Sequence, residues 1–222
     1  MTSIILFKTK NGERLFLAGD TQHAYDVSTY SKTKIFPLIA GKFLFAGSGS
    51  DLIINHVYNQ SISCINLEDF KARIENAMSN ENYAPSIETE QHIKYLNMGS
   101  GILVIDITNL TYKKFVNLKE QHNEEVNFAM IGSPNSEFIG QCQEKLFLVT
   151  DYEKEIFENF FECFDFLGKH DAMTGHPALF PVEIFCIEEG KIRKFKIKLK
   201  NRIYSDKFDI HKSDNYEVKK DD

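Results

Sequence analysis

The chain has no tryptophan and only four cysteines among its 222 residues. The cysteines form no CxxC pair and show no other spacing typical of a metal site; they are Cys64, Cys142, Cys163 and Cys186. Isolated cysteines of this kind are typical of buried free thiols in a cytoplasmic protein. We therefore expect neither a disulfide framework nor a thiolate metal centre.

Signatures of metal and cofactor enzymes are also missing. The seven histidines show no HExxH or similar paired spacing, and neither a P-loop nor a GxGxxG pattern occurs. The segment Ser48-Gly49-Ser50 lacks the GxSxG order of a serine hydrolase elbow. We expect no metal and no cofactor.

Long apolar runs and an excess of basic residues are absent as well. The first apolar run, Ile4 to Phe7, is interrupted by Lys8, and no segment approaches the length of a transmembrane helix. The formal net charge of −6 gives no basic footprint for nucleic acid. We expect a soluble cytoplasmic protein with no membrane and no nucleic-acid partner.

What the chain does contain is enough apolar material for one sizeable core. Hydrophobic residues make up 42% of the sequence, and 19 residues are phenylalanine. Short β-prone runs bounded by turn residues predict strands over residues 3–8, 14–18, 34–36, 42–46, 101–107, 111–115, 126–131, 179–187 and 191–199. The polar residues 21–33 are predicted to form a loop, which leaves four strands before the first helix.

Helical spacing of apolar residues begins after the glycine-rich turn near residue 49. One stripe contains Leu52, Ile53 and Val57, and a second runs from Leu67 to Met78 with Asn66 as its N-cap. A polar loop is predicted from residue 79 to 90, with a short helix near residues 87–96. Two further helices are predicted over residues 137–149 and 152–167.

This order of elements predicts segregated layers. Two antiparallel sheets between two helix pairs would bury both the apolar strands and the helix stripes, so we expect an α+β protein with a four-layer αββα sandwich. No repeat or linker divides the chain. Residues 1–204 are expected to form a single domain, and the charged residues 205–222 a loose C-terminal tail.

Thr2, directly behind Met1, is the leading candidate for a catalytic residue. Removal of Met1 would give a threonine whose free α-amine can act as the base for its own hydroxyl. Such a nucleophile also needs a buried lysine beside the amine, a carboxylate that fixes the lysine, and a backbone N–H that receives the oxyanion. Candidates follow in that part of the chain: Asp20, Lys34 and the glycine turn at Gly47.

On these residues the chain resembles the proteasome β-type family of N-terminal nucleophile (Ntn) hydrolases, which includes HslV-like peptidases. The matching segments, in order, are Thr2, Leu17-Ala18-Gly19-Asp20, Thr33-Lys34-Ile35, Phe45-Ala46-Gly47-Ser48-Gly49-Ser50, Ile131-Gly132-Ser133 and His170-Asp171-Ala172-Met173-Thr174-Gly175. The resemblance covers most of residues 2–200 and implies the Ntn fold, with two sheets between helix pairs.

The resemblance also implies a role for each matched residue. Thr2 would be the nucleophile, Lys34 would lower the proton affinity at the nucleophile, Asp20 would hold Lys34, and the Gly47 amide would bind the oxyanion. The residues implied to surround the α-amine and to help it move the proton are Ser133, Asp171 and Thr174. A peptide amide would be attacked, an ester would form on Thr2, and water would release it.

The implied protein is a threonine-type endopeptidase that acts on peptides or unfolded proteins and assembles as a ring-like homo-oligomer. The resemblance also offers an ATPase unfoldase as a partner. Phe157, Phe161 and Leu148 are compatible with subunit contacts or with ordinary core. Two alternatives stay open. One is a non-catalytic proteasome-like structural or interaction subunit, which retained Met1 would favour, and the other is an Ntn amidohydrolase acting on a small amide.

Four of the candidate residues also have a purely structural interpretation. Asp20 ends a strand at a turn, where aspartate is common, and Lys34 fits a solvated lysine at a strand edge. Gly47 fits a tight strand-to-helix turn, and Ser133 before Pro134 fits the start of a helix.

Overall fold

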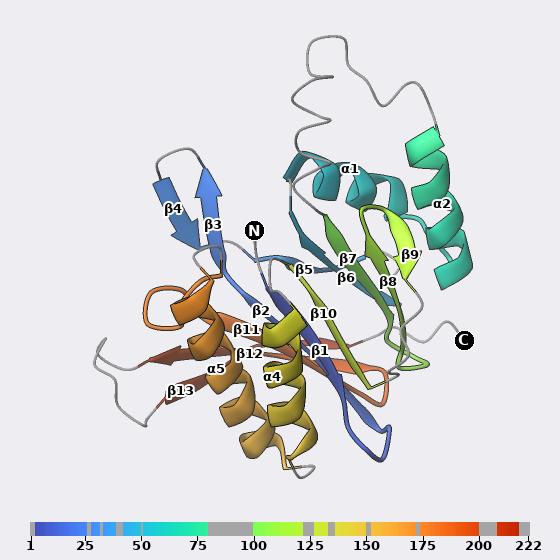
Figure 1. The fold of residues 1–222 in the computed structure, drawn as a ribbon. Helices are drawn as coiled ribbons and strands as arrows, with labels where there is room; N and C mark the ends of the chain where they lie inside the picture. Colours follow the sequence, from blue (N-terminus) through green and yellow to red (C-terminus); the bar gives the residue numbers. More distant parts are fainter. Residues whose placement is uncertain are drawn as a thin grey trace.

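The fold is a four-layer sandwich in which two antiparallel sheets are stacked between two pairs of helices (Figure 1). The computed structural model of the chain describes residues 3–25, 28–31, 33–38, 42–49, 51–79, 100–121, 127–132, 136–149, 152–171, 174–199 and 208–217. The predicted αββα class is confirmed.

The larger sheet has six strands in the order β10-β1-β2-β11-β12-β13. Their bounds are β1 Ile4–Lys8, β2 Arg14–Asp20, β10 Phe128–Ile131, β11 Val182–Glu188, β12 Lys191–Leu199 and β13 Phe208–Glu217. All neighbouring strands in this sheet are antiparallel. The predicted hairpins at the two ends of the domain are therefore confirmed, and they join through the pairing of β2 with β11.

The smaller sheet has five strands in the order β5-β6-β7-β8-β9. Their bounds are β5 Ile35–Pro37, β6 Phe43–Ser48, β7 Gly101–Asp106, β8 Thr111–Val116 and β9 Lys119–Gln121. The four helices in the described part of the chain are α1 Asp51–Ser61, α2 Leu67–Ser79, α4 Ser136–Phe147 and α5 Glu153–His170. Helices α1 and α2 cover the smaller sheet, and α4 and α5 cover the larger one (Figure 1).

Strand β1 shows how the strands divide their side chains between layers. Ile4 and Leu6 belong to the apolar layer between the sheets, whereas Ile5 and Phe7 pack with residues of α4 and α5. Because successive side chains of a strand point to opposite faces, a strand buried on both faces is apolar at every position. A third apolar layer, rich in phenylalanine, lies between the smaller sheet and the helices α1 and α2.

Two local predictions are confirmed. All four cysteines are buried and free. Asn66 caps α2, since its Oδ1 accepts a hydrogen bond from the Asp69 amide at 2.8 Å. The Asp69 carboxylate in turn accepts from the Ile65 amide at 3.0 Å, which satisfies a second backbone donor at this helix end.

Three polar segments form strands that the sequence pattern did not predict. Residues 21–33 were predicted to be a loop but contain the antiparallel pair β3 Gln22–Tyr25 and β4 Ser28–Ser31. The short β9 was also missed. The predicted loose tail was wrong for Phe208–Glu217, which pairs with β12 as the edge strand β13. Edge strands and two-stranded hairpins gain backbone hydrogen bonds without a buried face, so apolar alternation does not reveal them.

The apolar residues proposed for subunit contacts separate into two kinds. Phe157 is 2% exposed and belongs to the core beneath α5, and Phe161 packs against the same cluster. Leu148, which follows α4, is 76% exposed. Of the two interpretations left open, ordinary core is therefore confirmed for Phe157, and Leu148 alone of the three presents a large exposed apolar side chain.

Two predictions concern the segment between α2 and β7. The predicted polar loop and the short helix near residues 87–96 lie outside the described residues, apart from the end of α2 at Ser79. In the described part of the chain, no helix is both long enough and apolar enough to cross a membrane.

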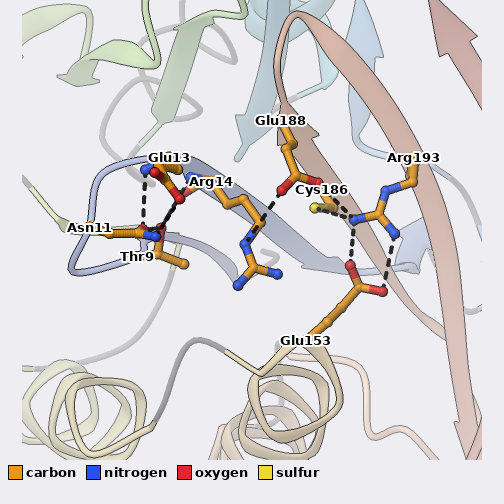
Figure 2. Close-up of polar contacts among 8 residues, drawn as sticks. All are labelled: Thr9, Asn11, Glu13, Arg14, Glu153, Cys186, Glu188 and Arg193. Atoms are coloured by element: carbon orange, nitrogen blue, oxygen red, sulfur yellow. Dashed lines mark hydrogen bonds and ion pairs between the residues drawn. The ribbon is translucent and has the colours of Figure 1, made fainter.

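Arg193 of β12 joins the first turn of α5 to the larger sheet (Figure 2). Its guanidinium donates to both carboxylate oxygens of Glu153, at 3.2 and 2.5 Å, and lies 3.4 Å from Glu188. The Nη2 atom of Arg193 lies 3.3 Å from the Cys186 sulfur. Burial raises the pKa of the Cys186 thiol to about 12, so this cysteine stays protonated and unreactive at neutral pH.

Candidate active site

The end of β2 and the start of β1 meet at one end of the sandwich. The antiparallel register pairs Ile4 with Gly19, which brings Ser3 opposite Asp20. The Asp20 amide donates to the Ser3 carbonyl at 3.3 Å, and the Ser3 amide donates to the Asp20 carboxylate at 2.8 Å. Both residues are buried. Hairpin geometry alone therefore fixes a carboxylate beside the first described residue.

Asp20 is the centre of a polar cluster within an otherwise apolar interior. Besides Ser3, its carboxylate accepts from the Gln22 amide at 2.9 Å and from the Gly175 amide. The Lys34 ammonium lies 3.8 Å from it and also donates to the Gln22 carbonyl. The Asp20 side chain is fully buried, and that of Lys34 is only 10% exposed.

Opposing effects act on the pKa of Asp20. Burial disfavours the charged form and raises the pKa, while Lys34 and the three backbone donors act in the other direction. Burial prevails, and the pKa of Asp20 is about 6 instead of 3.8. The carboxylate is therefore ionised at neutral pH, and its charge is balanced by one nearly buried lysine.

A chain of hydroxyl groups leads from Ser3 to the loop after α5. The Ser3 and Thr174 hydroxyls lie 2.7 Å apart, and the Thr174 hydroxyl donates to the Asp171 carboxylate at 2.8 Å. Because the single proton of Thr174 is used toward Asp171, Ser3 must be the donor to Thr174. The lone pairs of the Ser3 hydroxyl oxygen then stay available to accept a hydrogen bond from another donor.

Glycine at position 175 lets this loop close onto Asp20. A Cβ at Gly175 would lie 2.7 Å from the Gln22 Cβ and 3.0 Å from Asp20 Oδ1. Gly168 in α5 permits an equally close approach, since its Cβ would lie 2.6 Å from the His176 Cα. A Cβ would collide with the His176 backbone at Gly168 and with the side chains of Gln22 and Asp20 at Gly175. The loop is thereby held between α5 and the polar cluster.

Gly47 adjoins the same cluster, but two contacts constrain its role. Its N–H donates to the Lys34 carbonyl at 3.2 Å, so a substrate oxyanion would have to compete for this donor. A Cβ at Gly47 would lie 2.5 Å from Ile54 Cγ2. Glycine is therefore required for the packing of β6 against α1, whatever its part in chemistry.

Four of the seven residues expected at the site fall in one connected cluster. Contacts run from Lys34 through Asp20 and Ser3 to Thr174 and Asp171. The nucleophile candidate Thr2 and the candidate Ser133 lie outside the described residues. Among the described residues, no group of three acidic, histidine or cysteine side chains is arranged to hold a metal ion.

Ser3 is the member of the cluster that sequence reasoning missed. Its backbone and its hydroxyl link the two halves of the cluster, since one contacts Asp20 and the other Thr174. The available signal was its position: a strand that begins at residue 4 and pairs with a strand ending at Asp20 must place residue 3 beside that aspartate.

Comparison with solved structures identifies the fold. Eukaryotic HslV from Trypanosoma brucei matches with a TM-score of 0.57 and 12% sequence identity over 84% of this chain and 99% of that chain. An Anbu (Gly-1) mutant from Hyphomicrobium sp. strain MC1 matches with a TM-score of 0.58 and 13% identity over 100% of this chain and 90% of that chain. The fold is that of HslV and the proteasome-like Ntn hydrolases.

A third structure of this Ntn fold is BPH from Thiobacillus denitrificans in complex with epoxomicin. It matches with a TM-score of 0.54 and 15% identity over 84% of this chain and 98% of that chain. No protein-family model and no curated protein matches the sequence. At these identities the Ntn likeness is one of fold, and chemistry has to be argued from the cluster itself.

Proposed function

We propose that the chain is a threonine-type Ntn hydrolase that cleaves peptide amides with Thr2 after removal of Met1. The observation that carries the proposal is the buried ion pair of Asp20 and Lys34, fixed beside Ser3. Thr2 is joined to Ser3 by one peptide bond, so its Cα lies about 3.8 Å from that of Ser3. The proposal puts its hydroxyl and α-amine next to the cluster.

Each part of the cluster has a function in the proposed reaction. Lys34 would supply a positive charge to the threonine oxygen as it develops negative charge, and Asp20, 3.8 Å from the ammonium, would hold the lysine in place. The Ser3 oxygen, which donates its own proton to Thr174, can accept a hydrogen bond from the α-amine. Asp171 and Thr174 would thus orient the base through Ser3.

The proposed reaction is acyl transfer in two steps. The Thr2 oxygen attacks the amide carbon while its proton passes to the α-amine, and the C–N bond breaks as that proton is delivered to the leaving amine. Water then attacks the ester and restores the hydroxyl and the free amine. The oxyanion requires a donor, and the Gly47 N–H can serve once it exchanges the Lys34 carbonyl for the substrate oxygen.

The Ntn fold also supports the remaining parts of the proposal. They are a ring-like homo-oligomer, a cytoplasmic location, and substrates that are peptides or unfolded proteins, with an ATPase unfoldase as a possible partner. Size-exclusion chromatography with light scattering would measure the assembly. A monomer at all concentrations would contradict the ring.

The first experiment is the intact mass of the purified protein with and without a peptide epoxyketone. That warhead forms a stable ring with both a threonine hydroxyl and its free α-amine. We expect loss of Met1 and one adduct that maps to Thr2, and no adduct with Thr2→Ala. A Thr2→Ala protein that hydrolyses peptides as fast as wild type would refute the proposal.

One observation favours a second candidate, the non-catalytic subunit. The Gly47 N–H is already bonded to the Lys34 carbonyl, as expected if this turn only packs against α1. In that case Met1 would be retained and no adduct would form, although the protein would still assemble. A small-amide substrate is distinguished by comparing fluorogenic peptides with acyl-amino compounds.

A further inference from the structure

Glu183 of β11 is a buried carboxylate in a layer that is otherwise apolar. Among the described residues, Glu183 and Asp20 are the two charged residues that are buried, and Glu183 is only 4% exposed. Phe185 and Ile187, on the same face of β11, belong to the apolar layer between the sheets. A charge in such a layer costs free energy unless other groups compensate it. None of the steps of the proposed reaction uses this carboxylate, so its burial requires a separate explanation.

Both carboxylate oxygens of Glu183 are engaged. Oε1 lies 3.1 Å from the Lys194 ammonium and 3.4 Å from the Lys196 ammonium, both on the neighbouring strand β12. The Lys194 side chain is only 12% exposed, so water and salt screen this ion pair weakly. Oε2 accepts a hydrogen bond from the Thr33 hydroxyl. The lysines therefore balance the charge and hold one oxygen, which directs the other oxygen at Thr33.

Thr33 directly precedes Lys34, and the two residues are held by adjacent strands of the larger sheet. Thr33 donates to Glu183 of β11, while the Lys34 ammonium lies 3.8 Å from Asp20 of β2. The register of these strands pairs Asp20 with Val182, the residue before Glu183. Two consecutive residues that lead into β5 thus contact two buried carboxylates that are one register position apart.

The start of β5 depends on contacts of this kind, because β5 is the edge strand of the smaller sheet and has only three residues. On its paired side, the Lys34 carbonyl accepts a backbone hydrogen bond from β6. Toward the larger sheet, Ile35 packs beside Gly19, where a Cβ would lie 3.5 Å from Ile35 Cδ1. Gly19 is the register partner of Glu183. The hydrogen bond from Thr33 therefore adds a polar contact to the same junction between the sheets.

The position of the Lys34 ammonium depends on the position of its backbone. A lysine charge stands at the end of a long flexible stem, so it is fixed only if the stem starts from a fixed point. A misplacement of about 1 Å can cost about 10²-fold in rate. We propose that Glu183 is a positioning residue, which through Thr33 fixes the backbone from which Lys34 reaches Asp20. The placement of Lys34 follows from these contacts, and its value for catalysis rests on the proposed function.

The test follows the pKa of Asp20, which does not require turnover. The carboxyl ¹³C signals of labelled aspartate are recorded against pH in the full chain, and Asp20→Asn identifies the signal of Asp20. Lys34 lowers this pKa, which is about 6 in the wild-type protein. Thr33→Val removes the hydroxyl without changing charge, so Lys34 should be held less firmly and the pKa of Asp20 should rise by about 0.5–1. Thr33→Ser should retain the wild-type value.

Glu183→Met separates positioning from a direct electrostatic effect. Removal of a negative charge would by itself favour the ionised form of Asp20 and lower its pKa. Loss of the anchor for Lys34 acts in the opposite direction, so we expect a rise, as in Thr33→Val. Glu188→Met, the same substitution at a partly exposed position of the same strand, should leave the pKa of Asp20 unchanged. An unchanged or lowered pKa of Asp20 in Thr33→Val would overturn the proposal, whether or not Glu183→Met folds.

Reaction with a peptide epoxyketone then tests the link to catalysis. In an active enzyme, Thr33→Val should form the adduct about tenfold more slowly, and kcat should fall by a similar factor with little change in KM. If the pKa of Asp20 rises in Thr33→Val but the wild-type protein forms no adduct, the positioning of Lys34 stands and the peptidase proposal fails. Equal adduct rates in wild type and Thr33→Val, with no change in the pKa of Asp20, would leave the peptidase proposal intact and refute the role of Glu183.

Discussion

The Ser3 and Thr174 hydroxyls form a 2.7 Å hydrogen bond, although 171 positions separate the two residues in the chain. The bond joins the start of β1 to the loop after α5. Since Thr174 donates to Asp171, the protons in this chain all point away from Ser3. The Asp171 carboxylate thus sets the direction of both hydrogen bonds, from Ser3 to Thr174 and from Thr174 to Asp171.

Thr174→Val should disrupt this chain with little change in volume. Loss of the hydroxyl leaves the buried Ser3 oxygen without its acceptor, which should destabilise the fold by about 1–3 kcal/mol. Peptide hydrolysis should fall about 10²-fold because the α-amine is no longer oriented. Thr174→Ser should retain both properties. Urea denaturation measures the stability, and peptide turnover measures the activity. Full activity in Thr174→Val would show that the hydroxyl chain is not needed for the reaction.

Lys34→Met should abolish reaction with an epoxyketone and leave Asp20 buried without its counter-charge. Because Lys34 lowers the pKa of Asp20, its removal should raise that pKa further. The variant should therefore be less stable than wild type at pH 8, and the deficit should shrink at pH 5, where Asp20 takes up a proton. Lys191→Met, at an exposed position at the start of β12, is the control. Undiminished adduct formation in Lys34→Met would refute the role of the lysine.

The pKa of Asp20 predicts opposite pH trends for stability and activity. The folded state holds the proton up to about pH 6, whereas the unfolded chain releases it near 3.8. The folded state thus binds more protons in this window, so its stability should fall by about 2 kcal/mol as the pH rises from 4 to 6. Activity needs the ionised carboxylate and should rise over the same range. Asp20→Asn should remove this component of the stability profile, and an unchanged slope would assign it to other groups.

Gly47→Ala tests whether this glycine serves packing, chemistry or both. The added methyl would meet Ile54 at 2.5 Å, and we expect a loss of about 1–3 kcal/mol in stability. Combining it with Ile54→Ala should relieve the overlap and recover part of that loss. If turnover returns with stability, the glycine is needed for space alone. Activity that stays low in a stable double variant would implicate the backbone at the end of β6 in oxyanion binding.

The Arg193–Glu153 contact should stabilise the fold without affecting catalysis. A double-mutant cycle with Arg193→Met and Glu153→Gln should give a coupling energy of about 1 kcal/mol, since the pair is bidentate but about 30% exposed. Salt should reduce the coupling. Turnover should equal that of wild type in all three variants, and a loss of turnover would indicate that α5 must be anchored for the loop at Thr174 to form.

The sequence predicted those parts of the fold that depend on buried apolar faces. The hairpin β1–β2, the helix α2 with its cap at Asn66 and the pair β11–β12 all carry such a pattern. The strands β3, β4 and β13 were not predicted, and what defines them is their backbone pairing, of β3 with β4 and of β13 with β12. Those elements could be recognised only with their partner strands in view.

The candidate site was predictable where a motif is local and not where it depends on register. Asp20 and Lys34 were named from short motifs, and they lie 3.8 Å apart. Ser3 was not named, because its place beside Asp20 follows only from the register of β1 against β2.

The alternation along β1 has a consequence for how its length can change. Ile4 and Leu6 face the other sheet while Ile5 and Phe7 face the helices, so a single-residue insertion within β1 would exchange the two sets. It would also turn the start of the strand away from Asp20. A change of two residues preserves the facing of every side chain. The geometry of the site at this strand end therefore tolerates an insertion of two residues within β1 but not an insertion of one.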